Sequence, residues 1–342
     1  KWDVRLPDNF ADDYELQPPG VRNYKEFIDL NYGHLPDDRE DLWLERRNYL
    51  INCMLLVDRQ FQEILDALDR QGLWDSTVVL LLSDHGEMNG AHRLTQKGAI
   101  PFDEATAVTL TACVPGGPQG VRTPAVASHL DLAPTLLDFA GLGTDELYER
   151  YPKLKGRSLR PAIMDPAEPG PRGSAAEPGD GALIAWDGLN MLDPQWGVAG
   201  ALKALADMGH PRAPMEMRGI DKFKAAGQKF GAPDYSLRNF YRTVVDGRYK
   251  LVRWFSPDNY GNPATVEELY ETSDVALYDL ENDPGELENL GHPDHPDHDP
   301  ELVGRMLEKL HALVEHELGP DERPFDLDMF GTREVRTGER DE

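Results

Sequence analysis

The chain has 342 residues, enough for one large domain or two smaller ones. It carries 62 acidic against 35 basic residues, and the net charge of −27 argues against non-specific binding to nucleic acid or to an anionic membrane. The only two cysteines, Cys53 and Cys113, are too few for a disulfide framework, and no apolar run approaches the ~18 residues of a membrane span. The acidic, lysine-poor composition fits either a salt-adapted surface or an ordinary acidic protein.

Residues 1–37 are rich in Pro, Gly and Asp, which predicts an extended N-terminal segment. Residues 1–5 lack the apolar core of a signal peptide. If other residues precede them, this observation says nothing about export, so the localisation stays unknown. A long amphipathic helix is predicted over 41–71, with Gly72 as its C-cap. Its apolar residues recur at spacings of three and four: Leu50, Met54, Val57, Phe61, Ile64, Leu65 and Leu68.

The stretch 78–98 is the most informative part of the chain. An aliphatic run from Val78 to Leu82 predicts a strand buried on both faces of a parallel sheet. It ends in Asp84 and His85, and a glycine-containing loop then leads to Lys97. Ligands gather at the carboxyl ends of strands in α/β sheets, so a carboxylate and an imidazole there could bind a cation, with a lysine nearby for an anionic substrate.

The remaining elements alternate strands and helices. A second buried strand is predicted over 107–114, a helix over 129–139 and a strand over 182–186. Asp246-Gly247 between two β-rich runs predicts a hairpin over 240–255, whose sheet the strand at 277–280 can extend. Asp299 and Pro300 suit the N-cap and first position of a last helix, which would turn Met306, Leu310, Leu313 and Val314 inward.

Several motifs together resemble the C-terminal part of the sulfatases, in the alkaline phosphatase superfamily. The Ser-Asp-His-Gly stretch at 83–86 is followed in the family's order by Phe102 to Thr106, by Val114 to Gly117 and by His129 to Leu137. Gly156 to Leu159 and Leu277 to Pro284 also fit, whereas the match is poor at about 187–233. The resemblance implies an α/β fold, with part of an alkaline-phosphatase-like main sheet, flanking helices, and a small C-terminal antiparallel sheet with a helix.

The resemblance also implies a sulfuric ester hydrolase whose nucleophile is not in these residues. A sulfatase makes its formylglycine nucleophile within Cys/Ser-x-Pro-x-Arg, and this motif does not occur here. Cys113 comes nearest, but Gly117 stands where Arg is required, so we interpret Cys113 as a small buried residue. The expected partner is therefore a missing N-terminal half that carries the nucleophile, and the chain alone is expected to be inactive.

By the same resemblance, Asp84 and His85 are metal ligands, and the divalent cation is most often Ca²⁺, with Mg²⁺ or Mn²⁺ as alternatives. Lys97 is the sulfate-binding lysine and a candidate general acid. His92 is a candidate catalytic residue, for which we favour a role in ordering the loop over a direct substrate contact. The substrate class is a small-molecule or carbohydrate sulfate ester.

Two alternatives remain open on the sequence. A phosphodiesterase or phosphonate monoester hydrolase of the same superfamily would share the Asp-His and lysine pattern, and a non-catalytic or split-gene subunit would bind a partner instead. The predicted domains are the C-terminal part of the catalytic α/β domain at 1–165, a linker with a possible specificity insertion at 166–237, an antiparallel subdomain at 238–320 and an acidic tail at 321–342.

Overall fold

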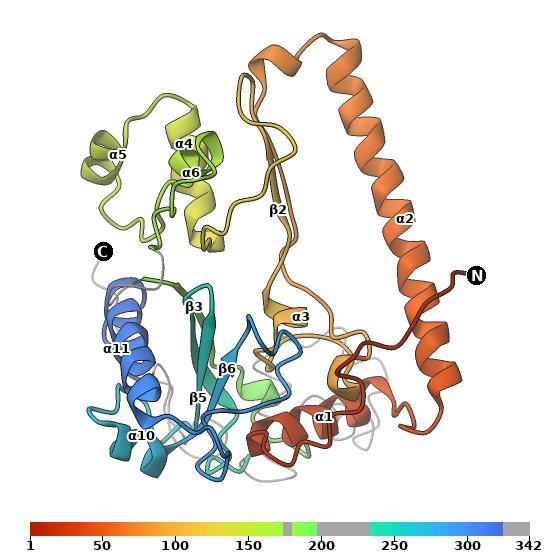
Figure 1. The fold of residues 1–342 in the computed structure, drawn as a ribbon, viewed down its shortest axis with the longest axis vertical. Coiled ribbons are helices and arrows are strands. Elements are labelled where there is room, and N and C mark those ends of the chain that lie inside the picture. The colour runs from red at the N-terminus through yellow and green to blue at the C-terminus, as the bar shows by residue number, and fades with distance from the viewer. Residues whose placement is uncertain (174–179, 197–232, 324–342) are drawn as a thin grey trace, which may run out of the picture.

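The structure is a computed structural model that describes residues 1–173, 180–196 and 233–323. A body built on a four-stranded sheet lies at one end, and an arm of one long helix, two short strands and several short helices rises from it (Figure 1). We call residues 49–82 and 107–165 the arm. Among the described residues, no helix has both the length and the apolar character needed to cross a bilayer.

The body's sheet is antiparallel throughout, in the order β3-β4-β5-β6. The hairpin is confirmed, because Val245 pairs with Lys250 across the turn that contains Asp246 and Gly247, where Gly247 has φ of 103°. The predicted strand at 182–186 and the third strand beside the hairpin are also confirmed. The four strands are β3 (Ala182–Trp186), β4 (Phe240–Val245), β5 (Tyr249–Phe255) and β6 (Ser273–Asp279).

Successive side chains of each strand point to opposite faces, so the sheet has two apolar faces. On one face Leu251 and Leu277 pack against α11 (Pro300–Glu317) and α10 (Val266–Thr272). As predicted, Asp299 caps α11, since its Oδ1 accepts hydrogen bonds from the backbone N–H groups of Glu301 and Leu302 at 2.9 and 3.1 Å. The four apolar residues predicted to face inward from this helix are all buried.

The other face of the sheet is covered by α1 (Pro19–Tyr32) and by the loop that follows the Asp-His pair. The prediction of an extended segment over 1–37 is therefore wrong for residues 19–32. Pro19 at the first helical turn starts the helix, and Val21, Tyr24, Phe27 and Ile28 form its buried face. Gly20 is needed because a Cβ there would lie 2.5 Å from the Trp254 ring.

The predicted long helix is confirmed as α2 (Glu40–Arg70), but only Trp43 and Asn48 are buried along it. The aliphatic run forms β1 (Val79–Leu82), which pairs with β2 (Leu110–Cys113) in a two-stranded antiparallel sheet. The expectation of a parallel strand buried on both faces is thus wrong within the described residues, since Leu81 is 40% exposed. Cys113 is also exposed, contrary to its interpretation as a buried residue, because it alternates outward on β2.

The rest of the arm is helical. The predicted helix at 129–139 is present as a 3₁₀ turn η3 (His129–Asp131) that continues into α4 (Leu132–Phe139). Short helices follow it at α5 (Thr144–Arg150) and α6 (Arg160–Met164), while α3 (Asp103–Thr106) lies where the arm joins the body (Figure 1). The remaining 3₁₀ turns are η1 (Trp74–Ser76), η2 (Ala91–Arg93) and η4 (Leu189–Met191). Most of the predicted insertion at 166–237 and of the tail at 321–342 lies outside the described residues.

Candidate functional site

Asp84 and His85 lie just beyond the end of β1, where the chain leaves the strand. Oδ2 of Asp84 is 3.4 Å from Nε2 of His85, so the two neighbouring side chains turn toward one point. Both are open to solvent, with 84% of the Asp84 side chain and 45% of the His85 side chain exposed. Adjacent residues within a regular strand point to opposite faces, and this convergence is possible because β1 has already ended at Leu82.

Local hydrogen bonds prepare both side chains as donors to a cation. The backbone N–H of His85 donates to Oδ1 of Asp84 at 3.0 Å and lowers the pKa of that carboxyl, as does the positive charge of Lys97 to a smaller extent. Nδ1 of His85 lies 2.9 Å from the carbonyl oxygen of Gly86 and can donate to it. Such a bond fixes the tautomer that leaves Nε2 with a free lone pair.

The loop after His85 is pinned to the backbone of α3. The N–H groups of Gly86 and Glu87 donate to the carbonyl oxygens of Ala105 and Glu104 at 3.0 and 2.8 Å. A Cβ at Gly86 would lie 1.9 Å from the Glu104 carbonyl oxygen, so only glycine allows this approach. The Glu87 carboxylate in turn accepts from the Gln96 N–H at 2.8 Å, which holds the loop's far end beside its start.

Lys97 follows Gln96, whose backbone N–H is bonded to Glu87, and its side chain is partly exposed. The positive charge of Lys97 contributes to the lowered pKa of the Asp84 carboxyl. Within residues 1–173, 180–196 and 233–323, no hydrogen bond or ion pair ties up its side chain. An ammonium group without a fixed counter-ion is suited to binding an anion such as sulfate.

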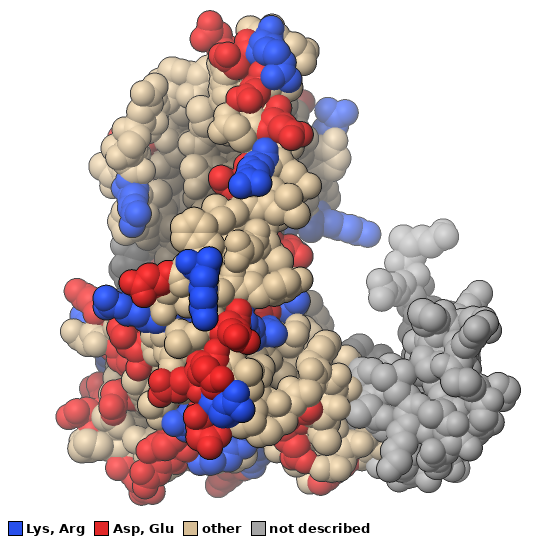
Figure 2. All heavy atoms as spheres, turned by 90° about the vertical axis from the view of Figure 1, so that its right-hand side faces the viewer, with Lys and Arg blue, Asp and Glu red and all other residues tan. Residues whose placement is uncertain are grey.

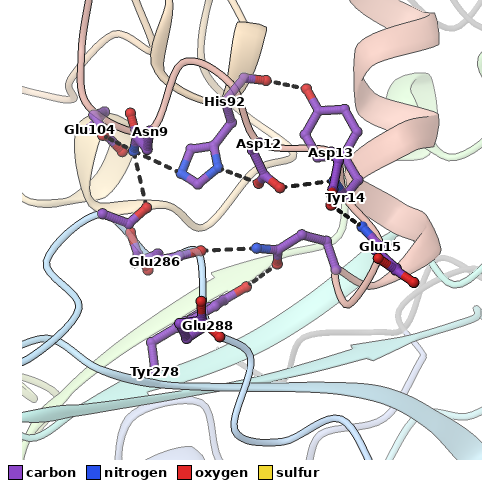
Figure 3. A network of polar contacts seen from close by, with 12 residues as sticks. Asn9, Asp12, Asp13, Tyr14, Glu15, His92, Glu104, Tyr278, Glu286 and Glu288 are labelled. Atoms are coloured by element: carbon purple, nitrogen blue, oxygen red, sulfur yellow. Dashed lines mark hydrogen bonds and ion pairs between the residues drawn. The ribbon is translucent and has the colours of Figure 1, made fainter. Parts of the chain in front are cut away.

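His92 is placed differently from the other candidates, since its side chain is fully buried. Its imidazole stacks on Phe102 with ring centroids 3.8 Å apart and an angle of 4° between the rings. Nδ1 lies 2.6 Å from Oδ2 of Asp12, and Nε2 lies 3.0 Å from Nδ2 of Asn9 (Figure 3). This full burial favours the role in ordering the loop over a direct substrate contact.

The backbone around His92 supports that role. His92 and Arg93 both have φ of 51°, a left-handed conformation that is uncommon for residues other than glycine. The Tyr14 hydroxyl donates to the His92 carbonyl oxygen, and the His92 N–H donates to the Asn9 carbonyl oxygen at 3.2 Å (Figure 3). These hydrogen bonds stabilise the left-handed turn that leads to Lys97.

Three residues of this network lie in the N-terminal segment and were missed by the sequence analysis. Asn9, Asp12 and Tyr14 approach His92 from about 80 residues away, and no local pattern marks them. The Asn9 side-chain amide also donates to Glu104 Oε1 at 2.8 Å and to the Gly285 carbonyl oxygen at 3.0 Å. The N-terminal segment thereby joins the loop, α3 and the turn after β6 at one point (Figure 3).

A buried ion cluster ties α3, to which the loop is bonded, to the sheet of the body. The Lys250 Nζ atom lies 2.7 Å from Oε1 of Glu286 and 2.5 Å from Oδ1 of Asp103. Lys250 and Glu286 are both inaccessible to solvent. Burial raises the pKa of the Glu286 carboxyl to about 7, against the opposing effect of the Lys250 charge. For Lys250, the charges of Glu286 and Asp103 outweigh burial and raise its pKa.

The arm's helical part contacts the site through His129. Nε2 of His129 lies 2.9 Å from the carbonyl oxygen of Ser83, the residue before Asp84. Asp131, at the end of the same turn, is fully buried and accepts two bonds from Arg172, at 2.7 and 2.9 Å. The Nη1 atom of the same guanidinium lies 2.7 Å from Oε1 of Glu317 on α11. The residue that follows β1, Ser83, is therefore held by the 3₁₀ turn η3, and that turn is connected to α11 through Arg172.

The donor set suits part of a cation site. A carboxylate with a lowered pKa and an imidazole with a free Nε2 are ligands that Ca²⁺, Mg²⁺ or Mn²⁺ accept, although histidine is less usual for the first two. Among the described residues, no group of three or more His, Cys, Asp or Glu side chains is placed to hold a metal ion. Asp84 and His85 are thus two donors whose chemistry suits a cation, without a third of these residue types beside them in the described ranges.

A family model described as Sulfatase matches residues 5–142. Among the curated relatives, choline-sulfatase of Rhizobium meliloti is 33% identical over 46% of this chain and 30% of its own length. The uncharacterized sulfatase YidJ of Escherichia coli is 38% identical over 42% of this chain and 29% of its own length, and an endo-4-O-sulfatase of Bacteroides thetaiotaomicron is 34% identical over 44% and 27%. The chain thus spans less than a third of the length of these relatives.

Solved structures agree on the fold. A putative sulfatase from Bacteroides thetaiotaomicron superposes with a TM-score of 0.55 at 21% identity, over 88% of this chain and 49% of its own. The putative sulfatase yidJ from Bacteroides fragilis gives a TM-score of 0.54 at 17% identity, over 96% of this chain and 53% of its own. Together with the family match over residues 5–142, these likenesses agree with the resemblance to the sulfatases, and they confirm the α/β fold class.

Proposed function

We propose that this chain is part of a metal-dependent sulfuric ester hydrolase and supplies two metal ligands and a sulfate-binding lysine. The observation that supports this most directly is the convergence of Asp84 and His85 at the end of β1. The positive charge of Lys97 also lowers the pKa of the Asp84 carboxyl. Named sulfatases among the relatives favour a sulfate ester over a phosphate ester as the substrate. Their names concern a choline ester and an endo-acting enzyme, so the substrate is a small-molecule or carbohydrate sulfate.

Each residue has a distinct task in this proposal. Asp84 and His85 hold the cation, which when bound supplies the positive charge that neutralises sulfate oxygens. Lys97 binds a sulfate oxygen as a point charge and is the candidate acid that protonates the leaving oxygen. His92, Asp12 and Glu87 keep the loop in the conformation that presents Lys97. The formylglycine nucleophile and the remaining ligands belong to a part of the enzyme outside these residues.

The test uses the complete enzyme, meaning a protein that contains this chain together with the nucleophile motif. Asp84→Ala should lower both the bound metal, measured by elemental analysis, and the turnover of an aryl sulfate, because an anionic ligand is lost. His85→Ala should do the same less severely, since it removes a neutral ligand. Full metal content and full turnover in Asp84→Ala would refute the assignment. Faster turnover of an aryl phosphodiester or an aryl phosphonate monoester than of the aryl sulfate would favour a phosphodiesterase or phosphonate monoester hydrolase instead.

A further inference from the structure

Lys97 lies between two residues whose backbone is left-handed. Gln96 has φ of 67° and Gly98 has φ of 120°. A left-handed conformation is uncommon for a residue with a Cβ atom, and it persists only where the surrounding contacts enforce it. The direction in which the Lys97 side chain leaves the loop therefore depends on what holds these two neighbours.

The residue before the lysine is held by the loop itself and by α2. Besides the bond from its N–H to the Glu87 carboxylate, the carbonyl oxygen of Gln96 accepts from the Met88 N–H at 3.0 Å. Nη2 of Arg46 lies 2.8 Å from the same Glu87 oxygen and neutralises it. These contacts fix the chain on the N-terminal side of Lys97.

The residue after the lysine is held by the sheet of the body. The Tyr241 hydroxyl, on β4, donates to the Gly98 carbonyl oxygen at 3.0 Å, across 143 residues of sequence. The Ile100 carbonyl oxygen lies farther from that hydroxyl, at 3.5 Å, while the Ile100 N–H donates to the Gly98 oxygen at 2.7 Å. The carbonyl group of Gly98 thus accepts one bond from its own loop and one from β4.

The neighbouring strand contacts Gly98 as well. Trp186 on β3 is the register partner of Tyr241. A Cβ added to Gly98 would lie 3.3 Å from Cη2 of Trp186 and 3.2 Å from Sδ of Met191, so both side chains pack against this glycine. One pair of adjacent strand residues therefore holds Gly98 by a hydrogen bond and by packing.

Tyr241 is itself firmly placed. It is 2% exposed, and its ring lies beside that of Trp254, with centroids 5.3 Å apart and an angle of 60° between the rings. Burial raises the pKa of the Tyr241 hydroxyl, so the group stays protonated at neutral pH and remains a hydrogen-bond donor.

The net negative charge of the chain makes the placement of Lys97 important. The net charge is −27, and on the face shown in Figure 2 Asp and Glu side chains are spread over much of the body. The field of the whole chain therefore opposes an approaching sulfate. Binding of such an anion depends on a cation held at the right place, because the attraction between two charges falls with their distance.

We infer that Tyr241 is a positioning residue for the sulfate-binding lysine. Its hydroxyl, together with the Trp186 ring, fixes Gly98 and through it the direction of the Lys97 side chain. This inference rests on the proposed function. The antiparallel sheet of the body thereby acts on the bound sulfate through the loop, although β3 and β4 are far from the Asp-His motif in sequence.

Removal of one hydroxyl tests the inference in the complete enzyme. Tyr241→Phe keeps the ring, and it should lower kcat for an aryl sulfate by about tenfold while KM and bound metal stay near the parent's values, because the lysine is misdirected in the transition state. Tyr270→Phe is the control, since that hydroxyl on α10 also donates to a glycine carbonyl oxygen, that of Gly291, at 2.7 Å. It should leave kcat unchanged, and melting temperatures verify that both variants are folded.

A double-mutant cycle with Lys97→Ala separates positioning from a general structural effect. Once the ammonium group is gone, Tyr241 has nothing to position, so the double variant should be no slower than Lys97→Ala alone. A further loss of about tenfold in the double variant would mean that Tyr241 acts independently of the lysine, and would overturn the inference. If Tyr241→Phe does not fold, Trp186→Leu, which removes the ring beside Gly98, takes its place in the cycle and should give the same pattern.

The same measurements distinguish this inference from the proposed function. Undiminished kcat in Tyr241→Phe beside a slow Lys97→Ala would reject the positioning role and leave the proposed function intact. Undiminished kcat in Lys97→Ala would reject the lysine's part in the proposed function, and the inference with it.

Discussion

Nδ1 of His92 lies 2.6 Å from Oδ2 of Asp12, and neither side chain is open to solvent. A residue from the N-terminal segment thus fixes the imidazole at the centre of the loop that carries Lys97. The pair is a buried, charge-assisted hydrogen bond, of the kind that is costly to break from one side.

Asp12→Ala should therefore destabilise the protein by about 1–3 kcal/mol, because it leaves the His92 ring N–H buried without an acceptor. The matched control is Asp13→Ala, since the neighbouring carboxylate is exposed and accepts only a local N–H. That change should stay within about 0.5 kcal/mol. Urea unfolding of the two variants checks the difference, and equal stabilities would mean that Asp12 does not hold the loop.

Lys97→Ala in the complete enzyme should reduce turnover by about 100-fold or more, equivalent to ~2.7 kcal/mol, if the ammonium group acts mainly in the transition state. Metal content should stay near normal, because lysine contacts the anion and not the cation. Lys153→Ala removes the same charge from an exposed position and should leave turnover unchanged. Steady-state kinetics beside elemental analysis decides, and an undiminished rate in Lys97→Ala would remove this lysine from the site.

Gly86→Ala should cost about 1–3 kcal/mol of stability, as a new methyl group pushes against backbone. The added Cβ would lie 1.9 Å from the Glu104 carbonyl oxygen, so the loop and α3 would have to move apart. Gly143→Ala is the control, because its φ is −61° and nothing lies within 4 Å of an added Cβ. Thermal unfolding of both variants measures the effect, which should be small for Gly143.

Glu286 should make stability depend on pH between about 4.5 and 7. Burial raises the pKa of this carboxyl from 4.5 to about 7, so in that window the folded protein binds a proton that the unfolded chain does not. The contribution of Glu286 to stability is then present below the unfolded pKa and is lost as pH rises through the folded one. Glu286→Gln should remove this component. Melting temperatures of both proteins from pH 5 to 8 should therefore converge or cross, and parallel curves would contradict the shift.

The net charge of −27 predicts a response to salt if the surface is salt-adapted. Melting temperature should then rise steadily from low to molar KCl, since screening relieves the repulsion among carboxylates. Sorbitol at matched osmotic strength separates screening from a general co-solvent effect. A melting temperature that is flat across the KCl series would favour the ordinary acidic protein.

Local patterns predicted the elements whose packing partners lie near them. The hairpin of β4 and β5 and the cap of α11 follow from Asp246-Gly247 and from Asp299-Pro300, whose signals are within a few residues. The helix α1 was missed because Pro and Gly in its first turn concealed the buried face of Val21, Tyr24 and Phe27. The pairing of β1 could not be predicted, since an aliphatic run does not tell which strand lies beside it.

In the candidate site, too, the residues with a local sequence signal were predicted and those that depend on tertiary contacts were not. Asp84, His85 and Lys97 belong to one stretch, so a family motif could identify them. The stretch is held directly by Asp12, and through Asp103 by Lys250 and Glu286. These contacts come from 80 or more residues away and depend on tertiary structure. The burial of His92 likewise depends on Phe102 and Asp12 meeting it from both sides, which residue spacing does not reveal.

Arg172 gives the C-terminal helix an influence on the site. Its guanidinium joins Glu317, on the last turn of α11, to Asp131, and the same 3₁₀ turn carries the His129 ring that meets the Ser83 carbonyl. A truncation that removes Glu317 would leave the Arg172 guanidinium with one counter-charge, Asp131, in place of two. The geometry next to Asp84 is consequently sensitive to changes more than 200 residues away in sequence, so truncations chosen to trim the tail should stop after α11 ends.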